Sequence, residues 1–209
     1  MFITLEGTEG CGKTSQVAPL AEFLRLQGWD VLTTREPGGT PIGEQIRQVL
    51  HSLDNTEMHA RTEILLFQAA RAQHVEQVIR PHLARGGVVM CDRYADSTVA
   101  YQGYGREQPL EPLQALVDYA TGGLKPDLTL LLDLDVEVGL RRRAKGGEWN
   151  RLDALEVAFY QRVRQGYYEL VRAEPKRWVV IDASLSPLEV QMAMRSAVMN
   201  RLEGIASHE

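Results

Sequence analysis

The chain of 209 residues has few cysteines, no excess of positive charge and no long apolar run, and each shortage excludes a class of protein. Two cysteines, Cys11 and Cys91, are too few for a disulfide framework and lack the spacing of metal ligands. The five histidines are scattered and form no ligand pattern. A net charge of −5 argues against the basic field that a nucleic-acid polymer would require.

The apolar segments are all short. None approaches the ~20 residues needed to cross a bilayer, and no basic segment precedes the first of them, so we expect neither a membrane span nor a signal peptide. We therefore expect a cytoplasmic protein. The length and the absence of repeats or linkers predict a single domain over residues 1–209.

Short apolar runs alternate with helical patterns along the chain. The predicted strands cover residues 2–6, 30–34, 86–92, 128–134 and 177–182. Near-continuous Val, Ile and Leu runs are typical of strands covered by helices on both faces. This alternation predicts a mainly parallel, doubly wound α/β sheet.

Three of the predicted helices can be placed along the chain. The first begins at about Lys13, and the longest runs from about Glu57 to Ala84. The last helix has a complete start signal, in which Ser186 is the N-cap, Pro187 lies in the first turn and Glu189 completes a capping box.

The segment "EGTEGCGKT" (6–14) matches the phosphate-loop pattern G-x-x-x-x-G-K-[ST] and lies between a strand and a helix. Backbone N–H groups of such a loop bind phosphate oxygens, Lys13 reaches the β- and γ-phosphates, and the Thr14 hydroxyl ligates Mg²⁺. The loop alone does not say what receives the phosphate. Glu9 is unusual, because it places a carboxylate in a loop that attracts anions.

Phosphate loops serve kinases and also GTP-hydrolysing switches. A switch needs D-x-x-G after its third strand, but Asp92 is followed by Arg, Tyr and Ala. "LKPD" (124–127) lacks the Asn of a guanine-reading motif and precedes its strand. The sequence therefore favours a phosphate-transferring enzyme over a switch, and its length disfavours a ring-forming motor ATPase.

Polar residues follow the predicted strands at one edge of the sheet, where ligands bind in this architecture. Arg35 and Glu36 follow the second strand, and Asp92 and Arg93 follow the third. Asp92 is positioned to hold Mg²⁺, directly or through water, and Arg93 to bind a second phosphate group. The next helix places hydroxyls, an aromatic edge and an amide in pairs four residues apart, namely Ser97, Thr98, Tyr101 and Gln102. A solvated polar helix is the alternative for this stretch.

In "ILLFQAARAQHVEQVI", Arg71 lies four residues after Phe67, on the apolar stripe of the longest helix. A buried guanidinium requires a carboxylate or a ligand acceptor. Phe67 offers a ring on which a base can stack, and Arg71 can donate to a base oxygen. An internal salt bridge beneath a core Phe is the alternative.

The segment "LRRRAKGGEWNRLD" (140–153) gathers Arg141, Arg142, Arg143 and Arg151 around a Gly-Gly pair. A solvated basic helix end is one interpretation. The other is a mobile lid at about 141–153 whose arginines close over the transferring phosphates.

Six segments in this order resemble the thymidylate kinase family, namely "LEGTEGCGKT", "TREPGGT", "LLFQAARAQH", "DRYADSTVAYQG", "LDLDVEVGL" and "RLD" with "FYQRVRQGY". The resemblance covers nearly the whole chain and implies the P-loop nucleoside-monophosphate-kinase fold, a five-stranded parallel sheet flanked by helices on both faces. It implies transfer of the γ-phosphate of ATP to dTMP, with Mg²⁺, on the pathway to dTDP and dTTP. It also implies a homodimer.

The resemblance assigns each site residue a role. It implies that ATP is bound by Arg142 and by the loop residues Gly7, Thr8, Glu9, Gly10, Cys11, Gly12, Lys13, Thr14 and Ser15. It implies that dTMP is bound by Glu9, Arg35, Pro37, Arg47, Phe67, Arg71, Arg93, Ser97, Thr98, Tyr101 and Gln102. It assigns Mg²⁺ to Thr14 and Asp92, and catalysis to Lys13, Arg93 and Arg151. Within these sets, Glu9 contacts the 3′-hydroxyl of dTMP, which accounts for its carboxylate.

The lid departs from the family pattern. The family commonly has Asp-Arg-aromatic/aliphatic-Glu, whereas this chain has Asn150-Arg151-Leu152-Asp153. Gly10 stands where the eukaryotic branch has a basic residue, so the chain resembles the bacterial branch, with its catalytic arginine in the lid. The choice among Arg142, Arg143 and Arg151 stays open.

Overall fold

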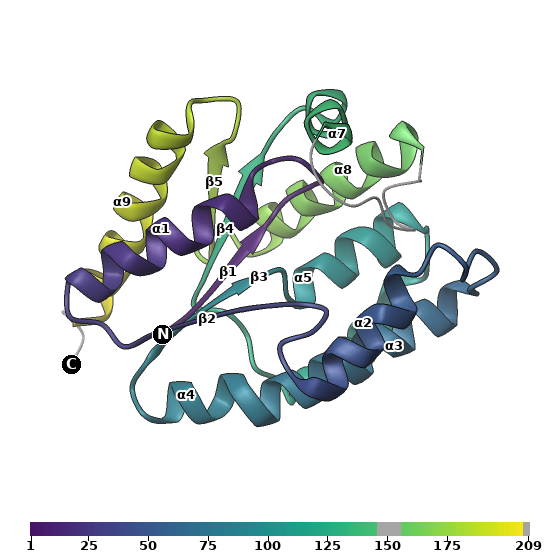
Figure 1. Ribbon diagram of the computed structural model, residues 1–209, viewed down its shortest axis with the longest axis horizontal. Coiled ribbons are helices and arrows are strands. Elements are labelled where there is room, and N and C mark those ends of the chain that lie inside the picture. Colours follow the sequence, from purple (N-terminus) through teal and green to yellow (C-terminus); the bar gives the residue numbers. More distant parts are fainter. Residues whose placement is uncertain (146–155, 207–209) are drawn as a thin grey trace.

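The computed structural model describes residues 1–145 and 156–206. Five parallel strands form one sheet in the order β2-β3-β1-β4-β5 (Figure 1). The strands are β1 (Phe2–Glu6), β2 (Val31–Arg35), β3 (Val88–Asp92), β4 (Leu128–Asp133) and β5 (Trp178–Asp182). Each predicted strand is present within two residues of its expected bounds, and the doubly wound fold is confirmed.

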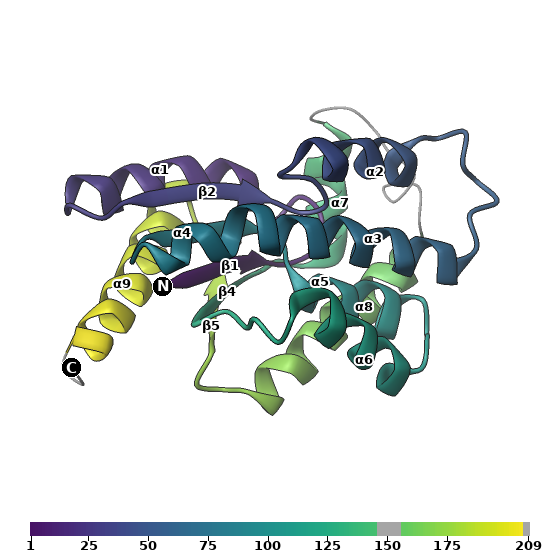
Figure 2. The same cartoon turned by 90° about the horizontal axis from the view of Figure 1, so that it is seen from below.

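Helices cover both faces of this sheet (Figures 1 and 2). They are α1 (Lys13–Leu26), α2 (Pro41–His51), α3 (Ala60–His74), α4 (Arg80–Ala84), α5 (Ala95–Thr98), α6 (Leu110–Thr121), α7 (Val136–Ala144), α8 (Val157–Ala173) and α9 (Pro187–Ala206). Two π-helical segments, η1 (Val75–Ile79) and η2 (Val99–Gly105), continue α3 and α5.

Alternate strand residues enter different cores, as the two-residue period of a strand requires. On one face, Ile3 and Leu5 pack with α1 and α9. On the other face, Phe2 packs with η1, and Leu131 packs with η2 and α8. Both faces of the central strands are therefore buried, which explains their unbroken apolar sequence.

The last helix begins as the sequence predicts. Ser186 Oγ accepts the N–H of Glu189 at 3.3 Å, and the Glu189 carboxylate accepts the N–H of Ser186 at 3.0 Å. This reciprocal pair is the capping box, and α9 begins at Pro187.

The longest helical segment, predicted from about Glu57 to Ala84, is present from Ala60 to Ala84 and differs from the prediction in two details. The helix begins at Ala60, where the His59 side chain accepts the N–H of Arg61 at 3.2 Å. It also widens into η1 before Pro81. Proline lacks an N–H and its ring clashes with the carbonyl four residues earlier, and a π turn at this point relieves the clash.

The helix that follows β1 is α1, which packs with α9 on one face of the sheet. The helical segment that follows β3 includes η2, which packs with α8 on the other face. The chain therefore leaves β1 and β3 toward opposite faces. A crevice at the carboxyl ends of β1 and β3 follows from this divergence.

Candidate active site

The loop from Gly7 to Lys13 joins β1 to α1 and folds tightly against α7. Gly10 and Gly12 have φ angles of 70° and 93°, which side-chain-bearing residues rarely adopt. A Cβ atom at Gly10 would lie 1.9 Å from the Gly139 carbonyl oxygen, so only glycine fits there. The Lys13 amine donates to the carbonyls of Gly7 and Thr8, both at 2.9 Å. The loop thus has the geometry that binds phosphate oxygens through backbone N–H groups and a lysine.

Thr14 and Asp92 meet beside this loop. The Thr14 hydroxyl donates to Asp92 Oδ2 at 2.7 Å, which brings two hard oxygen donors together at the edge of the pocket. Within residues 1–145 and 156–206, no group of three or more His, Cys, Asp or Glu side chains is arranged to hold a metal ion. One hydroxyl and one carboxylate suit Mg²⁺ that takes its other ligands from water and phosphate oxygens. The donor set therefore fits Mg²⁺.

Arg93 follows β3 in a left-handed backbone conformation, with a φ of 68°. Its N–H donates to the Leu5 carbonyl at 3.0 Å, which holds this turn against β1. The guanidinium donates to the Gly7 carbonyl and to Glu9 Oε1, both at 2.9 Å, and lies 4.8 Å from the centre of the Tyr101 ring. The strained turn thus aims the guanidinium at the phosphate loop.

Glu9 is held from two sides. Arg93 donates to Oε1, and the Tyr101 hydroxyl donates to Oε2. Burial raises the pKa of Tyr101 well above its ordinary value, so its hydroxyl stays protonated and remains a donor. The Glu9 carboxylate is therefore fixed at the junction of the loop and the segment that follows β3.

Arg71 is 2% exposed, and its guanidinium has the carboxylate partner that the salt-bridge interpretation requires. Its Nε donates to Glu36 Oε2 at 2.8 Å, and the guanidinium also contacts Gln68, Thr98 and the Tyr94 carbonyl. It is therefore in an internal salt bridge, and it also lines the pocket. Phe67 is half-buried and faces this pocket, outside the apolar clusters of the core, so its place on a core stripe was wrong.

Glu36 anchors this side of the pocket. Burial alone would raise its pKa, but Arg71 and His74 outweigh that effect and hold the pKa of Glu36 below its ordinary value. His74 Nδ1 lies 3.0 Å from Glu36 Oε1, so that nitrogen carries a proton toward the carboxylate. Glu36 is therefore ionised.

Arg35 and Arg47 extend from the segments that flank Pro37. Arg35 forms two hydrogen bonds with Glu44, at 2.8 and 3.1 Å, and Arg47 donates to the Pro37 carbonyl at 2.8 Å. Both guanidinium groups line the same cavity as the phosphate loop. The segments on either side of Pro37 thus place two positive charges in the cavity, and Arg35 is next to Asp92 on the neighbouring strand.

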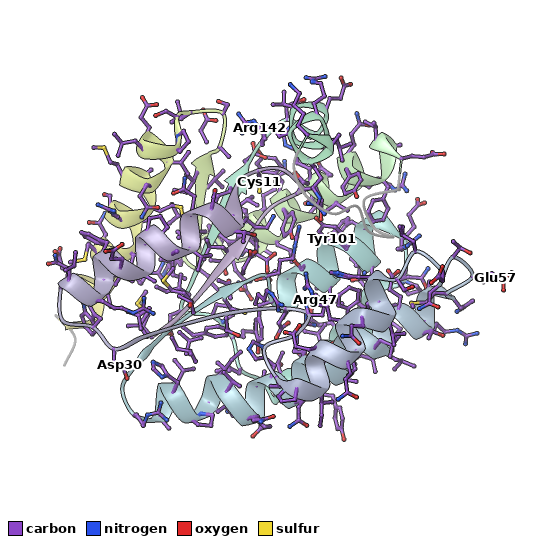
Figure 3. The ribbon with its side chains drawn as sticks, viewed as in Figure 1. Cys11, Asp30, Arg47, Glu57, Tyr101 and Arg142 are labelled. Atoms are coloured by element: carbon purple, nitrogen blue, oxygen red, sulfur yellow. The ribbon has the colours of Figure 1, made fainter. Side chains whose placement is uncertain are left out.

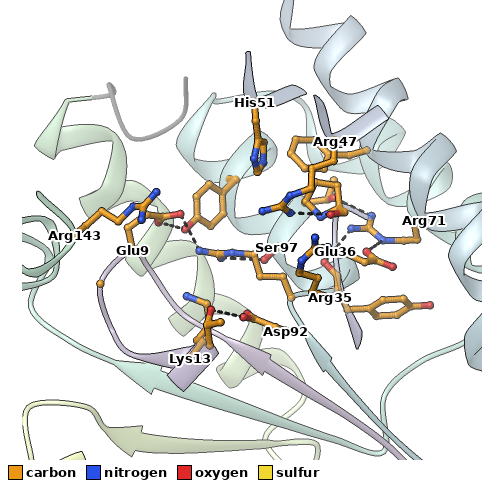
Figure 4. A pocket seen from close by; sticks show the side chains of 18 of the residues that line it. Glu9, Lys13, Arg35, Glu36, Arg47, His51, Arg71, Asp92, Ser97 and Arg143 are labelled. Atoms are coloured by element: carbon orange, nitrogen blue, oxygen red, sulfur yellow. Dashed lines mark hydrogen bonds and ion pairs between the residues drawn. The ribbon is translucent and has the colours of Figure 1, made fainter. Parts of the chain in front are cut away.

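One cavity of about 730 Å³ brings these groups together. Lys13 and Asp92 lie at one end of it, and Glu36 and Arg71 at the other (Figure 4). Figure 3 shows Arg47, Tyr101 and Arg142 around the carboxyl ends of the strands, whereas Asp30 is at the opposite end of the sheet.

Most of the residues predicted for the site line this cavity. They are Glu9, Gly10, Gly12, Lys13, Thr14, Ser15, Arg35, Pro37, Arg47, Phe67, Arg71, Asp92, Arg93, Ser97, Thr98, Tyr101, Gln102 and Arg142. Gly7, Thr8 and Cys11 belong to the loop but do not line it. Arg151 lies outside the described residues, as does most of the predicted lid.

Sequence reasoning did not assign Glu36, His51 or Tyr94 to the site, although all three line the cavity. Glu36 follows the second predicted strand. The need of a buried Arg71 for an acidic partner is the signal that could have assigned Glu36 to the site. His51 ends α2, and Tyr94 contributes its backbone to the turn after Arg93, so neither carries a motif of its own.

Glu6, the last residue of β1, is a fully buried carboxyl group beneath the cavity. It accepts hydrogen bonds from the Tyr94 N–H at 2.8 Å, the Ser97 hydroxyl at 2.6 Å and the Tyr167 hydroxyl at 2.8 Å. Burial, assisted by the Asp96 carboxylate, raises the pKa of Glu6 to about 7, against the opposing effect of Arg93. The folded protein therefore holds this proton more tightly than the unfolded chain.

We expect Glu6→Gln to become more stable relative to the parent protein as the pH rises. Because the folded pKa of Glu6 is raised from 4.5 to about 7, its contribution to stability is complete below the lower value and is lost through the higher one. The neutral amide in the variant does not titrate. Thermal unfolding of both proteins, measured from about pH 5 to pH 8, gives the difference in midpoint. A difference that does not change with pH would contradict the raised pKa.

A phosphate loop on the central strand of a parallel sheet, facing an arginine-lined wall in the same cavity, defines the class of P-loop nucleoside-monophosphate kinases. A family model described as thymidylate kinase matches residues 5–194. The chain belongs to the thymidylate kinase family.

Individual relatives agree with this assignment. The chain is 51% identical to the thymidylate kinase of Pseudomonas putida (strain W619), over 98% of this chain and 97% of the relative. It is 49% identical to that of Geotalea uraniireducens (strain Rf4), over 96% and 97%. A crystal structure of thymidylate kinase from Ehrlichia chaffeensis aligns with a TM-score of 0.75 at 34% identity, over 94% of this chain and 97% of that one.

The predicted family, fold and enzyme class are therefore confirmed: the chain is that of a kinase with the nucleoside-monophosphate-kinase fold. Among the described residues, no helix is both long and apolar enough to cross a membrane.

Proposed function

We propose that the protein transfers the γ-phosphate of ATP to dTMP, giving dTDP and ADP on the route to dTTP, and that the cavity of about 730 Å³ holds both nucleotides. The observation that carries this proposal is the contact between Arg93 and the phosphate loop. Arg93 touches Gly7 and Glu9, so a phosphate bound by Arg93 would lie next to one bound by the loop. Such proximity is what direct transfer requires.

On the donor side, Lys13 and the backbone N–H groups of the loop bind the β- and γ-phosphates of ATP. Thr14 and Asp92 would hold Mg²⁺, which would supply positive charge against the phosphates when bound. Arg142 donates to the Ala183 carbonyl at 3.1 Å and lines the cavity on the α7 side. This position suits a residue that flanks the donor nucleotide.

On the acceptor side, Arg93, Arg47 and Arg35 surround the place for the phosphate of dTMP. Glu9 receives the 3′-hydroxyl of the sugar, with Tyr101 fixing its carboxylate. The base stacks on Phe67 and accepts a hydrogen bond from Arg71. Pro37, Ser97, Thr98 and Gln102 complete this wall.

Catalysis in this proposal depends on position and charge rather than on a covalent intermediate. The transition state of phosphoryl transfer spreads negative charge over the phosphoryl oxygens, where Lys13 and Arg93 stabilise it. The lid with Arg151 lies largely outside the described residues, and its role stays a prediction.

We further propose that the enzyme works as a cytoplasmic homodimer. Leu65 on α3 and Leu116 and Tyr119 on the adjoining α6 are exposed, although such apolar side chains gain from burial. The family resemblance implies a second copy of the chain as partner, and we assign this face to it.

The proposed reaction predicts that ADP release requires both dTMP and Mg²⁺. A coupled assay with dTMP, dUMP, dCMP, dAMP and dGMP should give the highest kcat/KM with dTMP, because the acceptor wall is matched to it. Preference for another monophosphate would reassign the acceptor. ADP release that does not depend on any acceptor would indicate an ATPase or a switch and would end the proposal.

A further inference from the structure

The amide of Gln102 lines the acceptor wall, and an amide can face a ligand in two ways. Gln102 lies in η2 and is 2% exposed. Its C=O is an acceptor and its NH₂ a donor, and a half-turn of the amide exchanges them. By itself, this side chain would accept from one base and donate to another. Something else must fix its direction if it is to contribute to base selection.

Glu63 supplies that constraint from α3. It is 1% exposed, and its Oε1 accepts the Gln102 Nε2 at 2.9 Å. An ionised carboxylate has no proton to donate, so only the NH₂ end of the amide can face it. Arg106 lies 3.2 Å from Glu63 Oε2 and compensates its charge. The amide direction therefore follows from the chemistry of Glu63.

The other end of the amide faces the ligand. Oε1 of Gln102 accepts no hydrogen bond from the described residues and is open to the cavity that the side chain lines. Gln102 therefore offers the cavity an acceptor.

Arg71 offers a donor on the same wall. Its guanidinium donates to the hydroxyl of Thr98 at 2.9 Å, and Thr98 lies one helical turn before Gln102. A guanidinium has no acceptor atom, so Arg71 can only donate. A donor beside an acceptor matches a pyrimidine that has a carbonyl at C4 and a hydrogen on N3. Thymine and uracil have this edge. Cytosine reverses both groups, with an amino group at C4 and a bare N3.

We propose that Glu63 determines base specificity by acting through Gln102, which it fixes as an acceptor so that the site takes 4-oxopyrimidine monophosphates and rejects 4-aminopyrimidine ones. The inference rests on the proposed function. Glu63 itself does not line the cavity, so it is a positioning residue and does not contact the substrate.

The test compares kcat/KM for dTMP, dUMP and dCMP in the parent enzyme and in Glu63→Gln. The neutral amide at position 63 accepts either orientation of Gln102, so the preference for dTMP over dCMP should fall by about tenfold or more, since it depends on matched hydrogen bonds. The preference for dTMP over dUMP should not change, because the two bases share this edge. Glu63→Asp keeps an ionised acceptor and should retain most of the selection against dCMP.

Two outcomes and one control separate this inference from its alternatives. A general structural defect would lower all three kcat/KM values together, and an unchanged dTMP-to-dCMP ratio in an active Glu63→Gln enzyme would overturn the proposal. Asp96→Asn is the matched control, because it also neutralises a buried carboxylate paired with an arginine, Arg177, away from the cavity wall. It should leave both ratios unchanged.

If Glu63→Gln does not fold, Gln102→Leu provides the second test. Removing the amide removes the acceptor, so the same ratio should fall, and an unchanged ratio would overturn the proposal. Failure of the proposed function itself would be distinct, because the parent enzyme would then show no preference for dTMP.

Discussion

Lys13→Ala is expected to lower kcat for phosphate transfer by about 10³-fold or more, because it removes the charge that, in the proposed reaction, stabilises the transferring phosphate in the transition state. Lys13 is nearly buried in the loop, where its amine donates to the Gly7 and Thr8 carbonyls. The variant loses these two contacts and a third with Cys11 Sγ at 3.3 Å, but no side chain of the apolar core. It should therefore fold, and it should bind dTMP with little change.

Steady-state kinetics, thermal unfolding and dTMP titration together test this expectation. Lys125→Ala is a suitable control, because Lys125 pairs with Glu174 on the surface and lies outside the cavity. It should keep the parent rate. A Lys13→Ala enzyme with more than about a tenth of the parent kcat would show that the loop lysine does not stabilise the transferring phosphate.

Local sequence signals predicted the elements that are determined locally. The phosphate loop needs glycines at fixed positions, and the capping box of α9 needs Ser186 and Glu189 three residues apart. The strands were recognisable because burial on both faces removes the polar residues from them. Each of these features is contained within a few consecutive residues.

Features that depend on distant partners were not predictable in the same way. Arg71 required an acceptor, but the sequence did not identify Glu36, which is 35 positions away. Glu63 has no motif, and its importance follows only from the side chain of Gln102 across the fold. The left-handed turn at Arg93 also has no local signature, because β1 contacts hold it in place.

Arg93→Ala is expected to lower kcat/KM for dTMP by about 10³-fold or more, since a single arginine in phosphoryl transfer contributes 10³–10⁵ in rate. The guanidinium bridges the Gly7 carbonyl and Glu9 and lines the cavity. Under the proposed function, the loss should therefore affect both the binding of the dTMP phosphate and the position of the Glu9 carboxylate, which we assign to the sugar. ATP affinity should change much less, because Lys13 and the loop N–H groups remain.

Arg93→Lys distinguishes charge from geometry. A single ammonium group cannot bond Gly7 and Glu9 and still present a fork to two phosphate oxygens, so lysine should restore only a small part of the activity. Arg164→Ala is the control, because Arg164 forms an equally close carboxylate pair with Asp133 but does not line the cavity. If Arg93→Ala weakened ATP and dTMP equally, Arg93 would serve to hold the phosphate loop in shape, and the acceptor phosphate would depend on Arg47 and Arg35 instead.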